Sequence, residues 1–156
     1  MKKSYTTHPI DDVIYGLKPN NIAQFFDSVG ADLMRQTNLG ERTVRAMNKR
    51  MAQKSLCAMG GGMAIPNVKV RALHRPVTLL CVLDKAISCD TPDGQPLEMI
   101  CIVLSPTHDG TLHLQRLSRF SRLLKDQDLR DKIRDAQDAD IVRALLDAPN
   151  GFLIAA

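Results

Sequence analysis

The sequence predicts a single α/β domain in which a mixed β-sheet is flanked by helices. The chain has 156 residues, 44% of them hydrophobic, which is enough for one buried core and too short for two comfortable ones. Two short apolar runs with β-branched residues, Val77 to Asp84 and Met99 to Pro106, are typical of buried strands. Segments with helical spacing of apolar residues surround them, and this order of elements suits a sheet covered by helices.

Two helices are expected before the first strand. From Ile22 to Met34, apolar residues recur at helical spacing, after the Pro and Asn signals of "LKPNN". A second helix is expected from about Glu41 to Lys54. Its inward residues are Val44, Met47 and Met51, and its basic residues Arg42, Arg45, Lys49 and Arg50 are expected to point mostly outward.

The connection between the strands contains Pro92 to Gly94, a Pro-Asp-Gly turn signal. After the second strand, a helix is expected to begin near Thr111, "DADIVRALLDA" predicts a further helix, and "GFLIA" a final short strand. The inner side of the first of these helices is expected to carry Leu114, Leu117, Phe120 or Ser121, and Leu124. Residues 1–18 are expected to form an N-terminal lead, and 19–156 the domain.

Composition narrows the function and the location. The net charge of +4 comes from basic residues mixed with acidic ones, without a nucleic-acid-binding signature, which favours solvated helix faces over nucleic-acid binding. No apolar run is long enough for a membrane span and the N-terminus does not resemble a secretory signal, so a cytoplasmic protein is expected. The four cysteines include no Cys-x-x-Cys pair, which favours buried free thiols, and neither a metal nor another cofactor is expected.

Three segments carry a resemblance to a known family. They are "MAQKSLCAMGGGMAIPNVKV", "LLCVLDKAISCDTPDGQPLEMICIVLSP" and "HLQRLSRFSRLL". In this order and spacing they resemble the type 2 enzyme IIA proteins of the bacterial phosphotransferase system, in the fructose, mannitol and nitrogen-regulatory branch. The resemblance runs from about Pro19 to Ala156 and implies the architecture of that family.

The resemblance also implies a phosphate relay. In the family, a phosphohistidine carrier protein hands a phosphoryl group to a histidine directly after "Ala-Ile-Pro", and a second histidine at the start of the next helix helps to hold it. The matching positions here are Asn67 and His113. An amide nitrogen's lone pair is delocalised into its carbonyl group, so Asn67 should not carry phosphate. Leu56 and Cys57 match a Ser-Thr pair of the family, so hydroxyl groups near the phosphate are also replaced.

The function expected from this departure is a regulatory binding protein that keeps the enzyme IIA fold but is not an active phosphotransferase component. The alternative is an active phosphocarrier that uses His113. Thr111 is expected to cap the helix and so to place His113 in its first turn, where an anion is favoured. A third hypothesis is a thiol sensor or metal protein built on Cys57.

The pocket expected around Asn67 contains residues of the glycine loop and its neighbours: Cys57, Gly60, Gly61, Gly62, Ile65, Pro66 and His108. The glycines lack the spacing of a nucleotide-binding loop, so a tight turn is the expected role, with an amide nest for an anion as the alternative. His108 could approach the pocket, although a solvated loop histidine is the simpler interpretation.

The partner is expected to be a protein. The family's carrier docks through a basic face, and Arg116 and Arg119 near His113 would oppose it, which points to an acidic or phosphorylated partner. A phosphohistidine carrier protein, a transporter and a sensor kinase remain open. The oligomeric state is not predicted.

Overall fold

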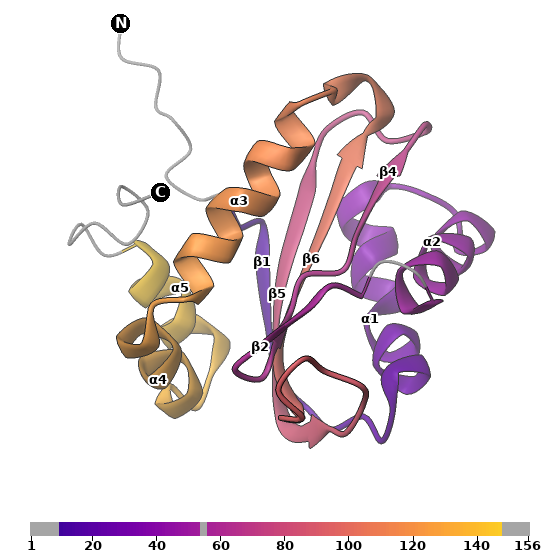
Figure 1. Cartoon of the computed structure of the whole chain (residues 1–156). Coiled ribbons are helices and arrows are strands. Elements are labelled where there is room, and N and C mark those ends of the chain that lie inside the picture. Colours follow the sequence, from indigo (N-terminus) through magenta and orange to yellow (C-terminus); the bar gives the residue numbers. More distant parts are fainter. Residues whose placement is uncertain (1–9, 54–55, 148–156) are drawn as a thin grey trace, which may run out of the picture.

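A six-stranded mixed β-sheet lies at the centre of the molecule, and helices cover both of its faces (Figure 1). The structure is a computed structural model and describes residues 10–53 and 56–147. This is the α/β architecture that the sequence predicts. The strands are β1 (Asp12–Leu17), β2 (Ala58–Gly60), β3 (Met63–Ala64), β4 (Asn67–Val70), β5 (Val77–Ile87) and β6 (Leu97–Pro106). The helices are α1 (Ile22–Thr37), α2 (Glu41–Gln53), α3 (Leu112–Leu124), α4 (Gln127–Asp135) and α5 (Ala139–Asp147), with a short 3₁₀ turn η1 (Thr107–Asp109) before α3.

The two predicted apolar strands, β5 and β6, form the antiparallel centre of the sheet. β1 pairs parallel with β5 on one side. On the other side, β3 and then β4 pair parallel with successive parts of β6, and β2 pairs antiparallel with β3. Asn67 lies opposite Val103, and Lys69 lies opposite Ser105. The segment after the glycine run is therefore extended sheet, where the sequence indicated only a loop.

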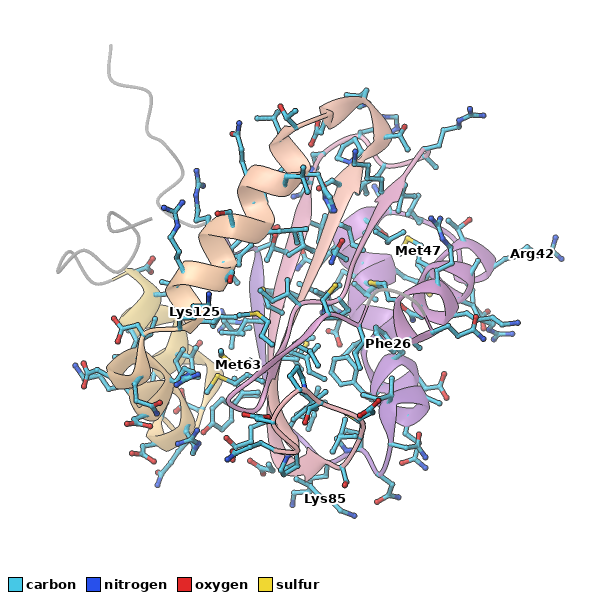
Figure 2. The ribbon with its side chains drawn as sticks, viewed as in Figure 1. Phe26, Arg42, Met47, Met63, Lys85 and Lys125 are labelled. Atoms are coloured by element: carbon cyan, nitrogen blue, oxygen red, sulfur yellow. The ribbon has the colours of Figure 1, made fainter. Side chains whose placement is uncertain are left out.

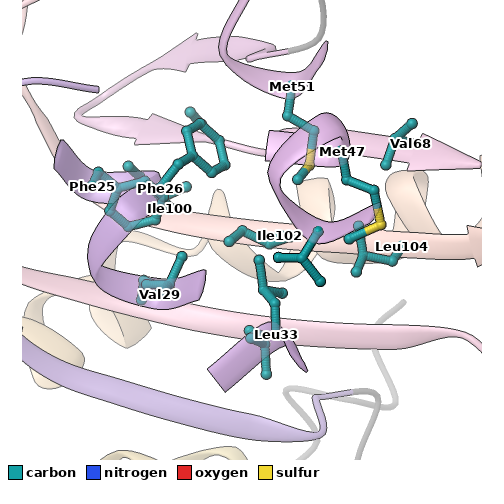
Figure 3. Close-up of a cluster of buried hydrophobic side chains, with 14 of the residues drawn as sticks. Phe25, Phe26, Val29, Leu33, Met47, Met51, Val68, Ile100, Ile102 and Leu104 are labelled. Atoms are coloured by element: carbon teal, nitrogen blue, oxygen red, sulfur yellow. The ribbon is translucent and has the colours of Figure 1, made fainter. Parts of the chain in front are cut away.

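Side chains alternate between the two faces of β5 and β6, and each face has its own core. On one face, α1 and α2 pack against β6, as Figure 3 shows for Phe26, Leu33 and Met51 beside Ile100 and Ile102. On the other face, residues such as Cys101 and Val103 pack against α3, α4 and α5. Because every second strand residue changes face, Asn67 and Ser105 are directed to the α3 side, while Val68 and Leu104 belong to the α1–α2 core.

The helices α1, α2, α3 and α5 and the Pro-Asp-Gly turn confirm the predictions, with ends shifted by a few residues. In α2, Val44, Met47 and Met51 are buried, and Figure 2 shows Arg42 projecting away from the protein. Residues 12–17, which the sequence analysis assigned to the N-terminal lead, form β1, an edge strand of the sheet. The predicted final strand "GFLIA" lies outside the described residues.

The sequence analysis missed one helix and wrongly predicted that one residue faces inward. α4 buries only Leu129 and Ile133, too few apolar positions for a helical pattern, although the Asp126 side chain caps it by accepting the Leu129 N–H at 3.1 Å. Leu114 was predicted to face inward on α3 but is 65% exposed, because Phe120, Leu123 and Leu124 set the buried side of that helix. Within the described ranges, none of the helices combines the length and apolarity needed to cross a bilayer.

Candidate functional site

Asn67 and His113, the two residues singled out from the sequence, lie in direct contact. Nε2 of His113 lies 3.1 Å from Oδ1 of Asn67. Asn67 begins β4 and is half-buried, whereas His113 is in the first turn of α3 and only 5% exposed. The contact forms because β4 pairs with the C-terminal half of β6, and α3 begins shortly after β6 ends.

The other ring nitrogen of His113 contacts β6. Nδ1 lies 2.7 Å from Oγ of Ser105, which is fully buried. Arg116, one turn further along α3, donates from Nη1 to the same hydroxyl at 2.7 Å. Its Nη2 lies 2.6 Å from Oδ2 of Asp109, so the guanidinium connects the hydroxyl to a mostly buried carboxylate. These five polar side chains thus form one continuous chain of contacts from Asn67 to Asp109.

Donor and acceptor roles along this chain follow from the Asn67 amide. Its Nδ2 donates to the carbonyl oxygen of Ile65 at 2.9 Å, so its Oδ1 faces His113, and an amide oxygen can only accept. Nε2 of His113 therefore carries the ring proton and donates to Oδ1 of Asn67. In the neutral ring Nδ1 is then an acceptor, and the Ser105 hydroxyl, which accepts from Arg116, donates to it. Both nitrogens of neutral His113 are therefore occupied.

The surroundings of His113 favour the neutral form of its imidazole ring. Burial lowers the pKa of His113, and the positive charges of Lys69 and Arg116 lower it further, while Asp109 opposes them. Lys69 is exposed and lies opposite Ser105 in the sheet. His108 is 69% exposed, with Nε2 3.9 Å from Oδ1 of Asp109, so it borders the network from outside.

The remaining predicted pocket residues divide into two groups. Cys57 is exposed, and Asn67 donates weakly to its Sγ at 3.5 Å. Ile65 and Pro66 are buried beside Asn67, and Val103 donates its N–H to the carbonyl oxygen of Pro66 at 3.0 Å. These three residues lie at the site, although Ile65 and Pro66 contribute backbone and packing.

The glycine run lies elsewhere. Gly62 accepts backbone hydrogen bonds from Glu98 and Met99 at the start of β6, whereas Asn67 pairs near its end. The N–H of Gly61 donates to Oδ2 of Asp93 at 2.8 Å, and this bond is the main reason why the pKa of Asp93 is lowered. The backbone N–H of Gly61, which could have bound an external anion, is therefore already bound to the carboxylate of Asp93.

Two further predictions need correction. Thr111 does not cap α3 with its side chain, because its backbone is already helical (φ −70°, ψ −15°) and its hydroxyl makes no capping hydrogen bond. Arg116 is engaged by Asp109 and Ser105, so of the two predicted partner-binding arginines only Arg119 is exposed.

Two of the four cysteines are poorly placed for thiol chemistry because they are buried. Cys81 and Cys101 are buried, and burial raises the pKa of both, to about 12 for Cys101. Cys89 is half-buried and Cys57 exposed. Across residues 10–53 and 56–147, no three or more His, Cys, Asp and Glu side chains gather as a possible metal site.

Sequence reasoning missed three members of the site: Ser105, Asp109 and Lys69. Ser105 had a visible signal, since it is a polar residue at the end of the otherwise apolar "MICIVL" run, on the same face as Val103. Lys69 is two residues from Asn67 in a strand and so shares its face. Asp109 had no comparable signal, because a carboxylate after a Pro-Thr-His sequence is ordinarily solvated.

The sheet with helices on both faces, and the pairing of β4 with β6 beside the start of α3, define an α/β/α domain. The profile of the family described as "Phosphoenolpyruvate-dependent sugar phosphotransferase system, EIIA 2" matches residues 9–148. The chain belongs to this family, as the resemblance implied.

Individual relatives and solved structures are similar to this chain in a way that agrees with the family match. A "Nitrogen regulatory protein" of Bradyrhizobium diazoefficiens is 32% identical over 137 residues, covering 88% of this chain and 90% of the relative. A "PTS system fructose-specific EIIA component" of Haloferax volcanii is 32% identical over 88 residues, 56% of this chain and 57% of the relative. The fold is similar to that of nitrogen regulatory protein IIA-Ntr from Neisseria meningitidis (TM-score 0.74, 24% identity, 86% of this chain and 91% of that one). It is also similar to IIA mannitol from Escherichia coli (TM-score 0.69, 16% identity, 86% and 95%).

Proposed function

We propose that this protein is an enzyme IIA-type regulatory protein that acts in the cytoplasm by binding a protein partner and accepts no phosphate at Asn67. The proposal rests on the hydrogen bond between Asn67 and His113. Asn67 stands where a family member would carry its acceptor histidine, and an amide has no nucleophilic lone pair. The relatives named nitrogen regulatory protein favour a regulatory role over transport of a particular sugar.

The rival function is an active phosphocarrier that uses His113. For this, one ring nitrogen must present a lone pair to a phosphoryl group. Nδ1 accepts a hydrogen bond from the buried Ser105 hydroxyl, and Nε2 is protonated and faces Asn67. A tautomer change would turn Oδ1 of Asn67 into a repulsive neighbour of the Nε2 lone pair. Turning the amide over to relieve this would in turn bring Oδ1 against the carbonyl oxygen of Ile65. These contacts oppose phosphorylation of His113.

Incubation with phosphoenolpyruvate, enzyme I and the carrier protein tests this proposal, with mass spectrometry under alkaline conditions that preserve phosphohistidine. No phosphate is expected on the wild-type chain, while a fructose-specific EIIA with an acceptor histidine serves as the positive control. Phosphate on any residue at a rate comparable with that control would overturn the proposal. Loss of that label in His113→Ala would then identify the rival mechanism, and labelling of Asn67→His alone would show that the surrounding site still supports transfer.

The partner is proposed to be acidic or phosphorylated at its docking face. Leu112 and Leu114 are exposed on both sides of His113, and Arg119 is exposed further along α3. Lys69 adds a second exposed positive charge beside the site. Apolar groups with a cationic border complement a partially apolar surface that carries negative charge. IIA mannitol of Escherichia coli has been solved in complex with phosphorylated IIB, which is a precedent for a phosphorylated partner in this fold.

Charge reversal at Arg119 distinguishes the candidate partners. Arg119→Glu is expected to weaken binding of an acidic partner such as a sensor kinase domain, and to strengthen binding of a carrier protein with a basic face. Arg42→Glu is the matched control, because Arg42 lies on α2 on the opposite side of the sheet (Figure 2). Equal effects of both variants, or binding that does not respond to salt, would contradict the proposed docking face.

A further inference from the structure

The strand β4 lies at the margin of the sheet and is paired on one side only. It pairs parallel with β6, beside which Figure 1 shows it, and with no other strand of the described chain. The N–H of Val103 in β6 donates to the carbonyl oxygen of Pro66 at 3.0 Å, so the backbone groups of every second residue from Pro66 onward point to β6. The N–H and C=O groups of Asn67 and Lys69, which lie between them, therefore point away from the sheet.

The protein covers this outward side only as far as Ile65. The N–H of Ile65 belongs to the same outward series and donates to the carbonyl oxygen of Cys57 at 3.1 Å, just before β2 begins. Cys57 has φ +50°, in the left-handed region, so the extended conformation of β2 does not continue alongside β4. Among the described residues, the outward backbone groups of Asn67 and Lys69 have no hydrogen-bonding partner.

The opposite margin of the sheet, β1, is closed by side chains. The N–H of Val13 donates to Oδ1 of Asp12 at 2.8 Å, and its carbonyl oxygen accepts from Nη2 of Arg143 at 3.4 Å. Closure of this kind protects a strand edge, because unpaired backbone groups invite pairing with another chain. The edge of β4 has no such closure in the described part of the chain, and it begins at Asn67 in the candidate site.

The charges beside the open edge decide which strand can pair with it. Lys69 and Arg71 are both exposed, and neither is ion-paired within the described residues. Arg116 also borders the site, but Asp109 already neutralises its charge. A second copy of the chain would bring another Lys69 to the edge, so like charges oppose self-pairing. A strand with acidic side chains would instead gain a cross-strand pair of opposite charges.

We propose that an extended acidic segment of the protein partner adds to β4 as a further strand and pairs with the outward N–H and C=O groups of Asn67 and Lys69. Asn67 and Lys69 are two residues apart in a strand, so their side chains share the face that carries His113. The acidic side chains of the added strand lie on this face, beside Lys69. The inference rests on the proposed function, since it names the part of the partner that meets the proposed docking face.

Hydrogen exchange of the ¹⁵N-labelled full chain tests the open edge directly. In the free protein, the amide of Lys69 should exchange at least about tenfold faster than the amides of Val68 and Val70, which point to β6. The probe is an acetylated and amidated peptide of alternating glutamate and valine, about eight residues long, which is enough to span β4. At saturation it should slow the exchange of Lys69 at least about tenfold and leave Val68 and Val70 nearly unchanged.

Two matched peptides separate backbone pairing from charge. The same glutamate–valine peptide, N-methylated at every residue, keeps its acidic side chains but has no backbone N–H to donate. A lysine–valine peptide keeps the backbone donors but reverses the charge. Both should bind at least about tenfold more weakly than the glutamate–valine peptide, because each lacks one of the two interactions that the edge of β4 requires.

Variants of Lys69 make the same separation on the protein. Lys69→Ala and Lys69→Pro both remove the charge, but only Lys69→Pro also removes the outward N–H. Proline is tolerated in an edge strand where the N–H faces solvent, so Lys69→Pro should fold and bind the glutamate–valine peptide at least about fivefold more weakly than Lys69→Ala. If it does not fold, the N-methylated peptide carries the same test. Lys125→Ala, at the opposite end of α3 from His113, is the control and should bind like the wild type (Figure 2).

Several outcomes overturn the proposal. These are slow exchange of Lys69 in the free chain, equal affinities of the glutamate–valine peptide and its N-methylated form, and equal affinities of Lys69→Ala and Lys69→Pro. Slowing of Lys69 exchange with protein concentration alone would assign the edge to a second copy of the chain instead. If strand addition fails while Arg119→Glu still weakens binding of an acidic partner, the proposed function stands. Labelling with phosphate tests that function separately.

Discussion

Asn67 and His113 share a 3.1 Å hydrogen bond between Oδ1 and Nε2, and this bond fixes which nitrogen of the histidine carries the proton. Two residues 46 positions apart are joined because β4 and the start of α3 meet at the same end of β6. Ser105 completes the arrangement from the other side of the ring. A neutral imidazole held in this way is positioned by its neighbours and has no lone pair left for a substrate.

The first prediction concerns pH. Burial and two nearby cations lower the pKa of His113 in the folded protein below its ordinary value of about 6.5. The unfolded chain therefore binds more protons at this residue as the pH falls, and folding stability should decrease below about pH 6.5. Above that pH the contribution of His113 is fully present.

Urea unfolding at several pH values measures this effect. His113→Gln should lose part of the decrease in stability between about pH 7 and pH 5, whereas His108→Gln should retain all of it, because His108 is 69% exposed. Identical pH profiles for the wild type and His113→Gln would refute the lowered pKa. NMR of the ring nitrogens gives a direct check, with the Nε2-protonated neutral form expected at pH 7.

The second prediction concerns Ser105, whose hydroxyl links Arg116 to His113. Ser105→Ala leaves Nδ1 of a buried histidine and one N–H of Arg116 without a partner, so it should cost about 1–3 kcal/mol of unfolding free energy. Ser118→Ala, an exposed serine on α3, should change stability by less than about 0.5 kcal/mol. The same Ser105→Ala sample should show a weaker preference for the Nε2-protonated ring. If both serine variants unfold alike, the hydroxyl does not stabilise the site.

The third prediction tests the buried side of α3. Leu124 is fully buried and Leu114 is 65% exposed, although both lie on one helix. Leu124→Ala should lower the free energy of unfolding by about 2–5 kcal/mol through the cavity that it leaves. Leu114→Ala should change it by less than about 0.5 kcal/mol. Thermal or urea denaturation of the two proteins decides the matter, and a large effect at Leu114 would mean that α3 is rotated relative to the structure.

These residues also show what the sequence could predict. The strands around Val77 and Met99 were recognisable because a strand buried on both faces is a continuous apolar run. Asn67 and His113 were found through a family resemblance, and the geometry then placed them in contact. Leu114 was misjudged because helical spacing alone allows several neighbouring faces, and only the position of the sheet selects Leu123 to be buried beside the predicted Phe120.

The sequence pattern could not predict which residues connect the members of the site. Asp109 becomes part of the network only because η1 turns its carboxylate toward Arg116, a tertiary contact with no periodic pattern behind it. The glycine run was assigned to the same pocket as Asn67, since the two are close in sequence. An extended segment separates them in space, and Gly61 meets residues of the loop before β6 and of α4 instead.

The last prediction concerns that glycine. Gly61 has φ +64°, and a Cβ added there would lie 2.6 Å from Nη1 of Arg130. Gly94 has a similar φ of +74° but nothing within 4 Å of an added Cβ. Gly94→Ala should therefore cost only the left-handed backbone, about 1–2 kcal/mol. Gly61→Ala should cost more, because Arg130 must also leave its contacts with Met63 and Gln127.

A double-mutant cycle separates the two causes. In an Arg130→Ala background the steric conflict is absent, so Gly61→Ala should cost about as much as Gly94→Ala in the same background. The cost of Gly61→Ala is measured as a change in the free energy of unfolding in urea. The difference between its costs in the two backgrounds gives the contribution of the clash with Arg130. If Gly61→Ala costs the same with and without Arg130, the backbone angle alone explains the glycine. A cost in the Arg130→Ala background well above that of Gly94→Ala would place the extra constraint in the hydrogen bond from the Gly61 N–H to Asp93.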